Sequence, residues 1–164
     1  MEASTVEAGS LTKAVVALVS LQTLFMWADE WIYHRRRGLE SWERWGHPLD
    51  SLAYVSALVL PAFAPPQPFW VQLYIILATF SALITTKDEW VHAAKCAAGE
   101  HWVHAVLFLV HPSILIFVGY LWLAGEGWGL RRVLPGLVGI FTCYQIARWC
   151  AISKPARGKT EIRP

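Results

Sequence analysis

Five runs of apolar residues constrain the fold of this chain more than any other feature of its sequence. A helix that crosses a bilayer needs roughly 20 mostly apolar residues, with a range of about 17–25. In a chain of 164 residues that is 55% hydrophobic, such runs predict an all-α integral membrane protein with about five transmembrane helices. The runs cover about residues 12–28, 49–64, 68–86, 102–123 and 133–152.

The five segments form a single membrane domain over residues 1–164. Pro61 and the run 65–68, which holds three prolines, end the second segment and predict a tight turn into the third. We expect two tandem helical hairpins, which begin on the same side and so form a parallel internal repeat, followed by a fifth helix. The expected units are a first hairpin at 12–65, a second hairpin at 68–124, the fifth helix at 133–152 and a polar tail at 153–164.

A short acidic phrase occurs twice, at corresponding positions of the two hairpins. The copies are Asp29-Glu30-Trp31 followed by His34, and Asp88-Glu89-Trp90 followed by His92. Each copy continues into a second group of acids and histidines that ends in His-Pro, at 40–48 and at 100–112. Because both copies follow apolar runs of the same direction, both groups fall at one face of the bilayer.

The acids and histidines of these groups are spaced as ligands on helices. Glu30 and His34 are four apart, as are Glu100 and His104, so each pair shares a helix face. Helical bundles that hold two iron or manganese ions use Glu and Glu-x-x-His side chains from four helices. The predicted metal ligands are Glu30, His34, Glu43, His47, Glu89, His92, Glu100, His101, His104 and His111. The residues predicted to orient these ligands are Asp29, Glu40, Asp50 and Asp88.

This ligand set predicts a pair of metal ions. A mixture of imidazoles and carboxylates suits iron, manganese or zinc, and we favour two irons. His111 supports the prediction, because it lies well inside the fourth apolar run. An ionisable side chain at that depth costs at least a few kcal/mol unless it binds or pairs with something.

The expected function is a non-haem di-metal oxidoreductase, with di-iron favoured, that desaturates or hydroxylates a lipid-like or other hydrophobic substrate. Because the chain has no flavin or nucleotide fingerprint, electrons should come from a separate donor. A net charge of +2 is too small to indicate a nucleic acid partner. Five short spans leave little room for a substrate cavity, so we also expect a homo-oligomer or a larger membrane complex.

In broad design the chain resembles the membrane fatty-acid desaturase and hydroxylase class, which also places histidine clusters at the cytosolic face. The three histidine boxes of that class, with His-x-x-x-His and His-x-x-His-His spacing, are absent here. This chain has fewer histidines and more carboxylates. No residue roles are therefore transferred from that class.

Two other functions remain open from the sequence. A zinc-dependent membrane hydrolase could use His92, His101, His104 and Glu100 of the second repeat alone. A metal or proton carrier, or a small subunit of a membrane complex, would also place acids and histidines in membrane helices. A carrier should have ligands near the midplane and on both sides, whereas here only His111 is deep.

Basic residues predict the orientation in the membrane. Three regions, at 35–44, at 87–95 and after 153, hold most of the lysines and arginines and fall on one side of a five-span chain. Since cytoplasmic loops are rich in these residues, we expect the N-terminus outside and the C-terminus in the cytoplasm. The predicted location is a bacterial inner membrane or its equivalent, with the site at the cytoplasmic face.

Overall fold

The computed structural model describes residues 2–39, 41–89, 93 and 96–151, without the side chains of 2–8, 37, 41, 88 and 151. Within these residues the regular structure is entirely helical. The long helices are α1 (Glu2–Ala28), α3 (Ser41–Phe63), α4 (Pro68–Ile84), α6 (Ala98–Leu123) and α7 (Trp128–Gln145). Short pieces extend or join them: the π-helix η1 (Asp29–His34), α2 (Arg35–Arg37), the 3-10 turn η2 (Thr85–Asp88) and the π-helix η3 (Ile146–Ala151). The predicted all-α class is confirmed.

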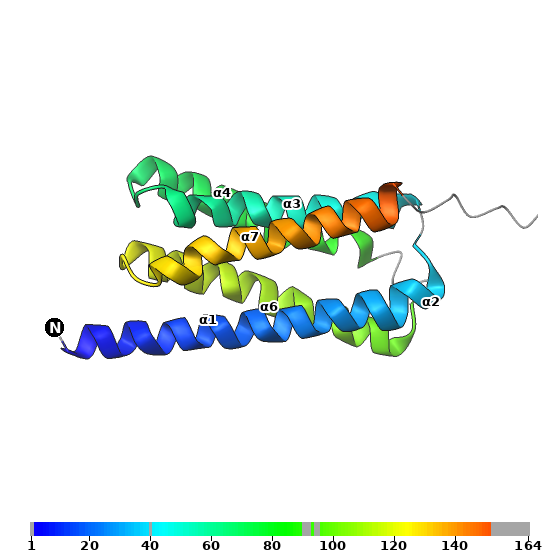
Figure 1. Cartoon of the computed structure of the whole chain (residues 1–164), viewed down its shortest axis with the longest axis horizontal. Helices are drawn as coiled ribbons and strands as arrows, with labels where there is room; N and C mark the ends of the chain where they lie inside the picture. Colours follow the sequence, from blue (N-terminus) through cyan, green and yellow to red (C-terminus); the bar gives the residue numbers. More distant parts are fainter. Residues whose placement is uncertain (1, 40, 90–92, 94–95, 152–164) are drawn as a thin grey trace, which may run out of the picture.

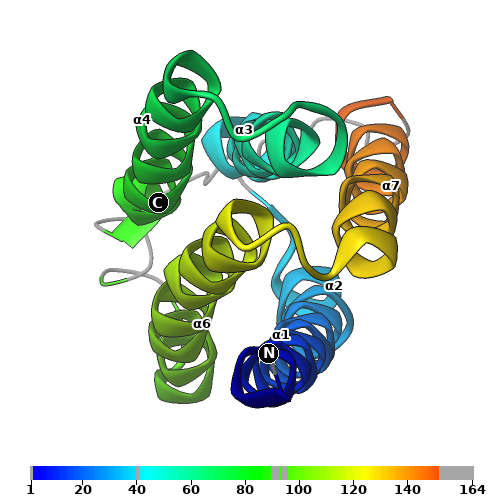
Figure 2. The ribbon, with the colours of Figure 1, turned by 90° about the vertical axis from the view of Figure 1, so that its left-hand side faces the viewer.

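The helices run roughly side by side along the long axis of the molecule (Figure 1). Seen from the end, α3 lies between α4 and α7, and α1 lies beside α6 (Figure 2). The main packing partner of α1 is therefore α6, which the sequence assigns to the other hairpin. The packing crosses the proposed repeat boundary, and the internal repeat stays a prediction.

Three helices are long and apolar enough to cross a membrane, namely Gly9–His34, Pro68–Lys87 and Ala98–Leu123. They correspond to the first, third and fourth predicted spans. Only 11% of the apolar window is buried in each of the first two, against 44% in the third. Much of the apolar surface of α1 and α4 thus faces outward, where a bilayer would cover it.

The hydrophobic core lies between these helices and is built mainly from side chains of α6 and α3, with one buried residue each from α1 and α7. Leu58, Ile114 and Val118 are almost completely buried. At the end that holds the α3–α4 and α6–α7 turns, Trp122 donates a 2.9 Å hydrogen bond from Nε1 to the carbonyl of Ala64. This hydrogen bond links α6 to the turn that follows α3.

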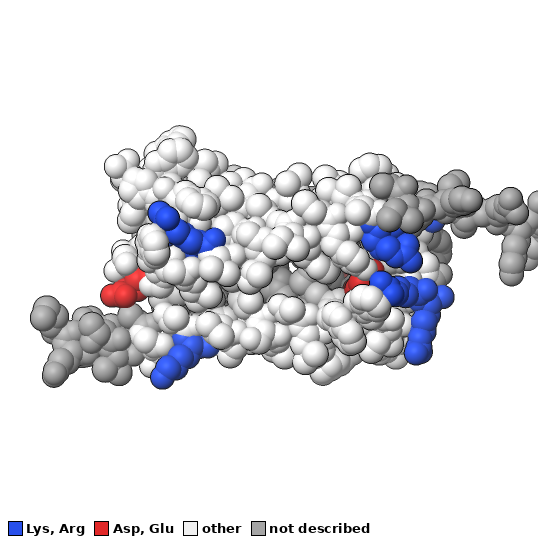
Figure 3. Space-filling model, in the orientation of Figure 1, with Lys and Arg blue, Asp and Glu red and all other residues white. Residues whose placement is uncertain are grey.

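The opposite end of the bundle holds η1, α2, η2 and η3 (Figure 1). Basic side chains gather at this end (Figure 3), and one of them, Arg35, lies over the ring of Trp31 at 3.2 Å from its centroid. Arg132 lies over Trp128 at 4.2 Å near the other end. Such arginine–tryptophan pairs suit the headgroup regions of a bilayer. The end with η1 and η3 is called the site end below.

Candidate metal centre

Four buried side chains meet at the site end, where η1 packs against the start of α6. Asp29 and His34 come from η1, and Glu100 and His104 come from α6. One donor atom from each lies within 4.8 Å of all the others. Their exposed fractions are only 7%, 3%, 2% and 6% in that order. This set, called the four-donor group below, could hold a metal ion.

The separations within the four-donor group fit a shared ion. Oδ2 of Asp29 lies 3.2 Å from Nε2 of His34 and 3.1 Å from Nε2 of His104. Nε2 of His34 lies 3.7 Å from Oε1 of Glu100. Ligands bound at roughly 2.0–2.2 Å around a tetrahedral ion lie about 3.3–3.6 Å from one another. These three separations are therefore close to the spacing of metal ligands, and the whole set lies within 4.8 Å.

The four-donor group does not satisfy its own hydrogen-bonding needs. Oδ1 of Asp29 and Nε2 of His34 are buried and make no hydrogen bond. Most buried polar atoms in proteins do have a partner, and unsatisfied ones call for an explanation such as an ion or a water. A bound cation would supply a partner for Oδ1 of Asp29, and a second partner for Nε2 of His34 beside its 3.2 Å ion pair with Oδ2 of Asp29.

The π-helix explains how Asp29 reaches the group. In a π-helix the backbone bonds run from residue i+5 to residue i, and here the N–H of Arg35 bonds the carbonyl of Glu30. This winding brings Asp29 and His34, which are five residues apart, to one face. The sequence prediction used α-helical spacing, under which Glu30 rather than Asp29 pairs with His34.

Glu30 stands one layer behind the group, where it contacts the far side of the His34 ring. Its Oε2 lies 3.8 Å from Nδ1 of His34. Two aromatic residues hold this carboxylate: Tyr144 donates to Oε1 at 2.8 Å, and Trp149 donates to Oε2 at 3.0 Å. A carboxylate on the second nitrogen of a ligating histidine fixes its tautomer and ring orientation. Asp29 thus lies in the four-donor group and Glu30 lies behind it, whereas the sequence analysis predicted Glu30 as the ligand and Asp29 as the residue behind it.

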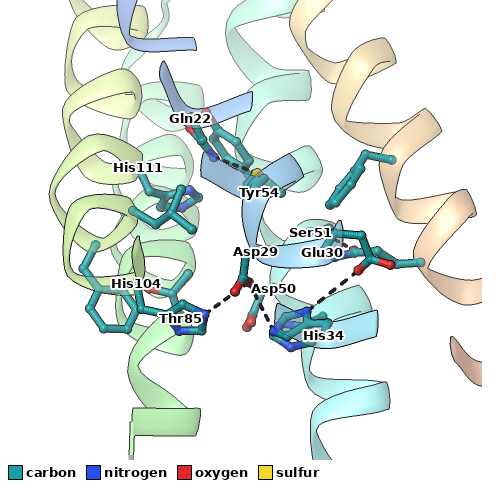
Figure 4. A pocket seen from close by; sticks show the side chains of 16 residues that line it. Gln22, Asp29, Glu30, His34, Asp50, Ser51, Tyr54, Thr85, His104 and His111 are labelled. Atoms are coloured by element: carbon teal, nitrogen blue, oxygen red, sulfur yellow. Dashed lines mark hydrogen bonds and ion pairs between the residues drawn. The ribbon is translucent and has the colours of Figure 1, made fainter. Parts of the chain in front are cut away.

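Three members of the four-donor group, Asp29, His34 and His104, line a cavity of about 110 Å³ that extends into the bundle (Figure 4). From His104 the cavity reaches His111, seven residues further along α6, or about 10 Å of helix rise. Its walls between these two histidines are mainly apolar. The apolar side chains that line it are Met26, Leu107, Phe108 and Phe141.

His47 and Asp50, both from α3, also line this cavity. The ring of His47 lies 4.8 Å from that of His34, centroid to centroid, and its Nε2 is buried without a hydrogen bond. Asp50 forms a 2.6 Å ion pair with Lys87. His47 thus stays beside the predicted centre, whereas Asp50 links α3 to η2.

The remaining predicted residues lie in different surroundings. Glu43 is fully buried, at 0% exposure, but is not one of the four donors. His101 and Glu89 form a pair at 3.7 Å whose side chains are 32% and 48% exposed, outside the four-donor group. His92 and Glu40 lie outside the described residues, as does the side chain of Asp88.

The sequence analysis missed the contribution of the last helix. Tyr144 and Trp149 support Glu30, and Gln145 accepts a 2.7 Å hydrogen bond from Ser51. The available signal was the polar pair Tyr144-Gln145 inside an apolar run. Buried polar side chains are usually hydrogen-bonded, so this pair marks the inward face of α7.

No protein family, curated protein or solved structure matches this chain. Its function has to be argued from the chemistry of the four-donor group and of the cavity beside it.

Proposed function

We propose that this chain is a membrane-embedded, metal-dependent oxidoreductase whose metal is held by Asp29, His34, Glu100 and His104. The observation that carries the proposal is the four-donor group itself: four buried donors whose ligand atoms lie within 4.8 Å of one another beside a cavity. Two carboxylates balance the charge of a divalent cation. That balance matters because an unpaired ion is costly in a low-dielectric interior.

The number of protein ligands favours iron over zinc. Four protein ligands close the tetrahedral shell of zinc, as in structural zinc sites, whereas catalytic zinc keeps one position open. Iron that accepts six ligands would keep two positions open. Histidines and carboxylates with open positions are typical of non-haem iron oxygenases. Bound iron would supply dioxygen activation and one-electron chemistry.

We propose one iron per chain rather than the two expected from the sequence. In the part of the chain that the structure describes, one group of four donors meets the spacing of a metal site. His47 lies against the ring of His34 and lines the cavity. In this proposal His47 packs beside the metal site and lines the cavity but does not bind the metal.

The surrounding residues have defined tasks in this proposal. Glu30, held by Tyr144 and Trp149, keeps Nε2 of His34 directed at the four-donor group. The apolar walls, which include Phe108, limit access of water to the reacting centre. Electrons would come from a separate donor that approaches the site end.

The first experiment measures metal content in detergent-purified protein expressed with ample iron. Elemental analysis and Mössbauer spectroscopy should find about one high-spin iron per chain. His104→Ala should lose that iron, whereas His101→Ala, three residues earlier on the same helix, should retain it. One zinc per chain would refute the oxidoreductase and indicate a structural zinc site, whose four protein ligands leave no position open. Absence of any bound metal from the intact protein would refute the proposal.

A further inference from the structure

The cavity has a second polar end, separate from the four-donor group. His111 lies halfway along α6 and is only 6% exposed. Tyr54 of α3 and Gln22 of α1 line the same part of the cavity, and Ser81 of α4 stands behind His111. Three of these side chains lie close together at the inner end of the cavity in Figure 4.

The contacts of these residues hold them in place around a hollow. Oγ of Ser81 lies 2.9 Å from Nε2 of His111. The ring of Tyr54 lies 4.2 Å from that of His111, and its hydroxyl reaches Oε1 of Gln22 only at 3.4 Å. Polar side chains at the depth of a membrane core are expensive, and they generally mark a functional site. Four helices contribute to this one, which indicates a built polar lining.

The size of the cavity limits what it can bind. An apolar protein cavity of about 150 Å³ accepts benzene. A cavity of about 110 Å³ therefore holds a molecule of about six non-hydrogen atoms or fewer. The acyl chain of a membrane lipid is several times too large to lie wholly inside this volume.

We propose that the cavity binds a small neutral amphiphile, a short-chain alcohol or carbonyl compound. Its polar group would hydrogen-bond with His111 and Tyr54, and its apolar part would lie against Leu107 and Phe108 toward the four-donor group. The inference rests on the proposed function in one respect, since it makes this molecule the substrate of the metal centre. Binding itself needs only the cavity.

Trifluoroethanol is a suitable probe, because it has six non-hydrogen atoms, one hydroxyl and a fluorine NMR signal. It is titrated into the full chain in lipid nanodiscs, before and after removal of metal with a chelator, with empty nanodiscs as the blank. We expect saturable binding to the protein in both states. Heptafluorobutanol, with twelve non-hydrogen atoms, should show no saturable binding.

Two variants locate the bound probe. His111→Leu and Tyr54→Phe should each weaken trifluoroethanol binding by about tenfold, the effect of losing one hydrogen bond of about 1.4 kcal/mol. Ser113→Ala is the matched control, since Ser113 lies on the same helix, does not line the cavity and donates to the carbonyl of Leu109 at 2.7 Å. Tyr54→Phe keeps the ring, so it remains informative where His111→Leu fails to fold.

The outcomes separate this inference from the proposed function. Saturable binding that survives in metal-free protein and falls in the two variants supports the cavity site, even where no iron is found. Wild-type protein that shows no saturable binding overturns the inference, as does undiminished binding in both variants. Equal binding of heptafluorobutanol would overturn the size limit.

Discussion

The two ends of the bundle differ in the partners of their buried polar side chains. At the end that holds the helix turns, polar side chains bond backbone carbonyls. Arg131 donates to the carbonyl of Glu126 at 2.7 Å and also to that of Pro61, and Trp122 donates to Ala64. Each of these donors has a fixed partner that belongs to the main chain.

At the site end some side chains also bond the backbone, as Arg44 does to the carbonyl of Leu39, but buried side chains from different helices also face one another. Asp29, His34, Glu100 and His104 converge, and buried atoms of the first two have no hydrogen-bond partner. The difference shows how to read buried polar residues in a helical bundle. Those that bond the backbone hold helices together, whereas those that converge without satisfying one another indicate a ligand. The variants below test this distinction.

The largest effect should come from Asp29→Asn. The amide keeps the shape of the side chain but removes the charge that faces both histidines. We expect metal affinity to fall by more than about 100-fold, beyond the range found when residues behind a ligand are changed. Competition with a chelator measures this affinity. A fall of less than tenfold would mean that Asp29 does not bind the metal.

Arg131→Met should have the largest effect on stability. It removes hydrogen bonds to two carbonyls, and bonds from a charged donor contribute about 1.5–3 kcal/mol each. Thermal or denaturant unfolding in detergent should show a loss of about 2 kcal/mol or more. The metal content of the folded fraction should not change. Loss of metal at unchanged stability would contradict the division between the two ends.

Tyr144→Phe should give a smaller effect at the site end. It removes the hydroxyl that holds Glu30 and leaves the rest of the ring in place. Since groups that support a ligand usually change metal affinity by about 10–100-fold, we expect about tenfold weaker binding. Glu30→Gln should behave similarly. If Glu30→Gln is as damaging as Asp29→Asn, Glu30 binds the metal directly.

The smallest effect is expected for Glu89→Ala. Its carboxylate is 48% exposed and pairs with His101 at 3.7 Å. Exposed pairs of this kind contribute about 0–1 kcal/mol, so stability should change by less than about 0.5 kcal/mol. Metal content should be unaffected. A marked loss of metal would mean that the metal centre includes Glu89 at the edge of the bundle.

Apolar run length and proline positions predicted the helices well. The third and fourth runs, at 68–86 and 102–123, correspond to α4 and α6, and the prolines at 65, 66 and 68 fall at the turn between α3 and α4. What the pattern could not predict is which helices pack together. Apolar faces are chemically interchangeable, so α1 packs against α6 without any mark of that choice in its sequence.

The candidate site was predictable where it follows ordinary helix geometry. Glu100 and His104, four apart on α6, lie together as their spacing predicts. The position of Asp29 within the four-donor group was not predicted, because the prediction assumed 3.6 residues per turn. A local change of helical winding has no simple sequence signal. The support from Tyr144 depends on tertiary packing, since 114 positions separate it from Glu30.

The π turn at Asp29–His34 also changes the direction in which side chains point around the axis of the first helix. Residues before the turn and residues after it therefore face different sides. One extra residue within the winding rotates all that follows by about 100° relative to all that precedes it. The part of α1 before Ala28 can thus keep its apolar contacts with α6. The side chain of His34 can at the same time point toward the cavity. Deleting one residue between Asp29 and His34 would restore ordinary α-helical winding and still leave these two side chains on one face, four residues apart.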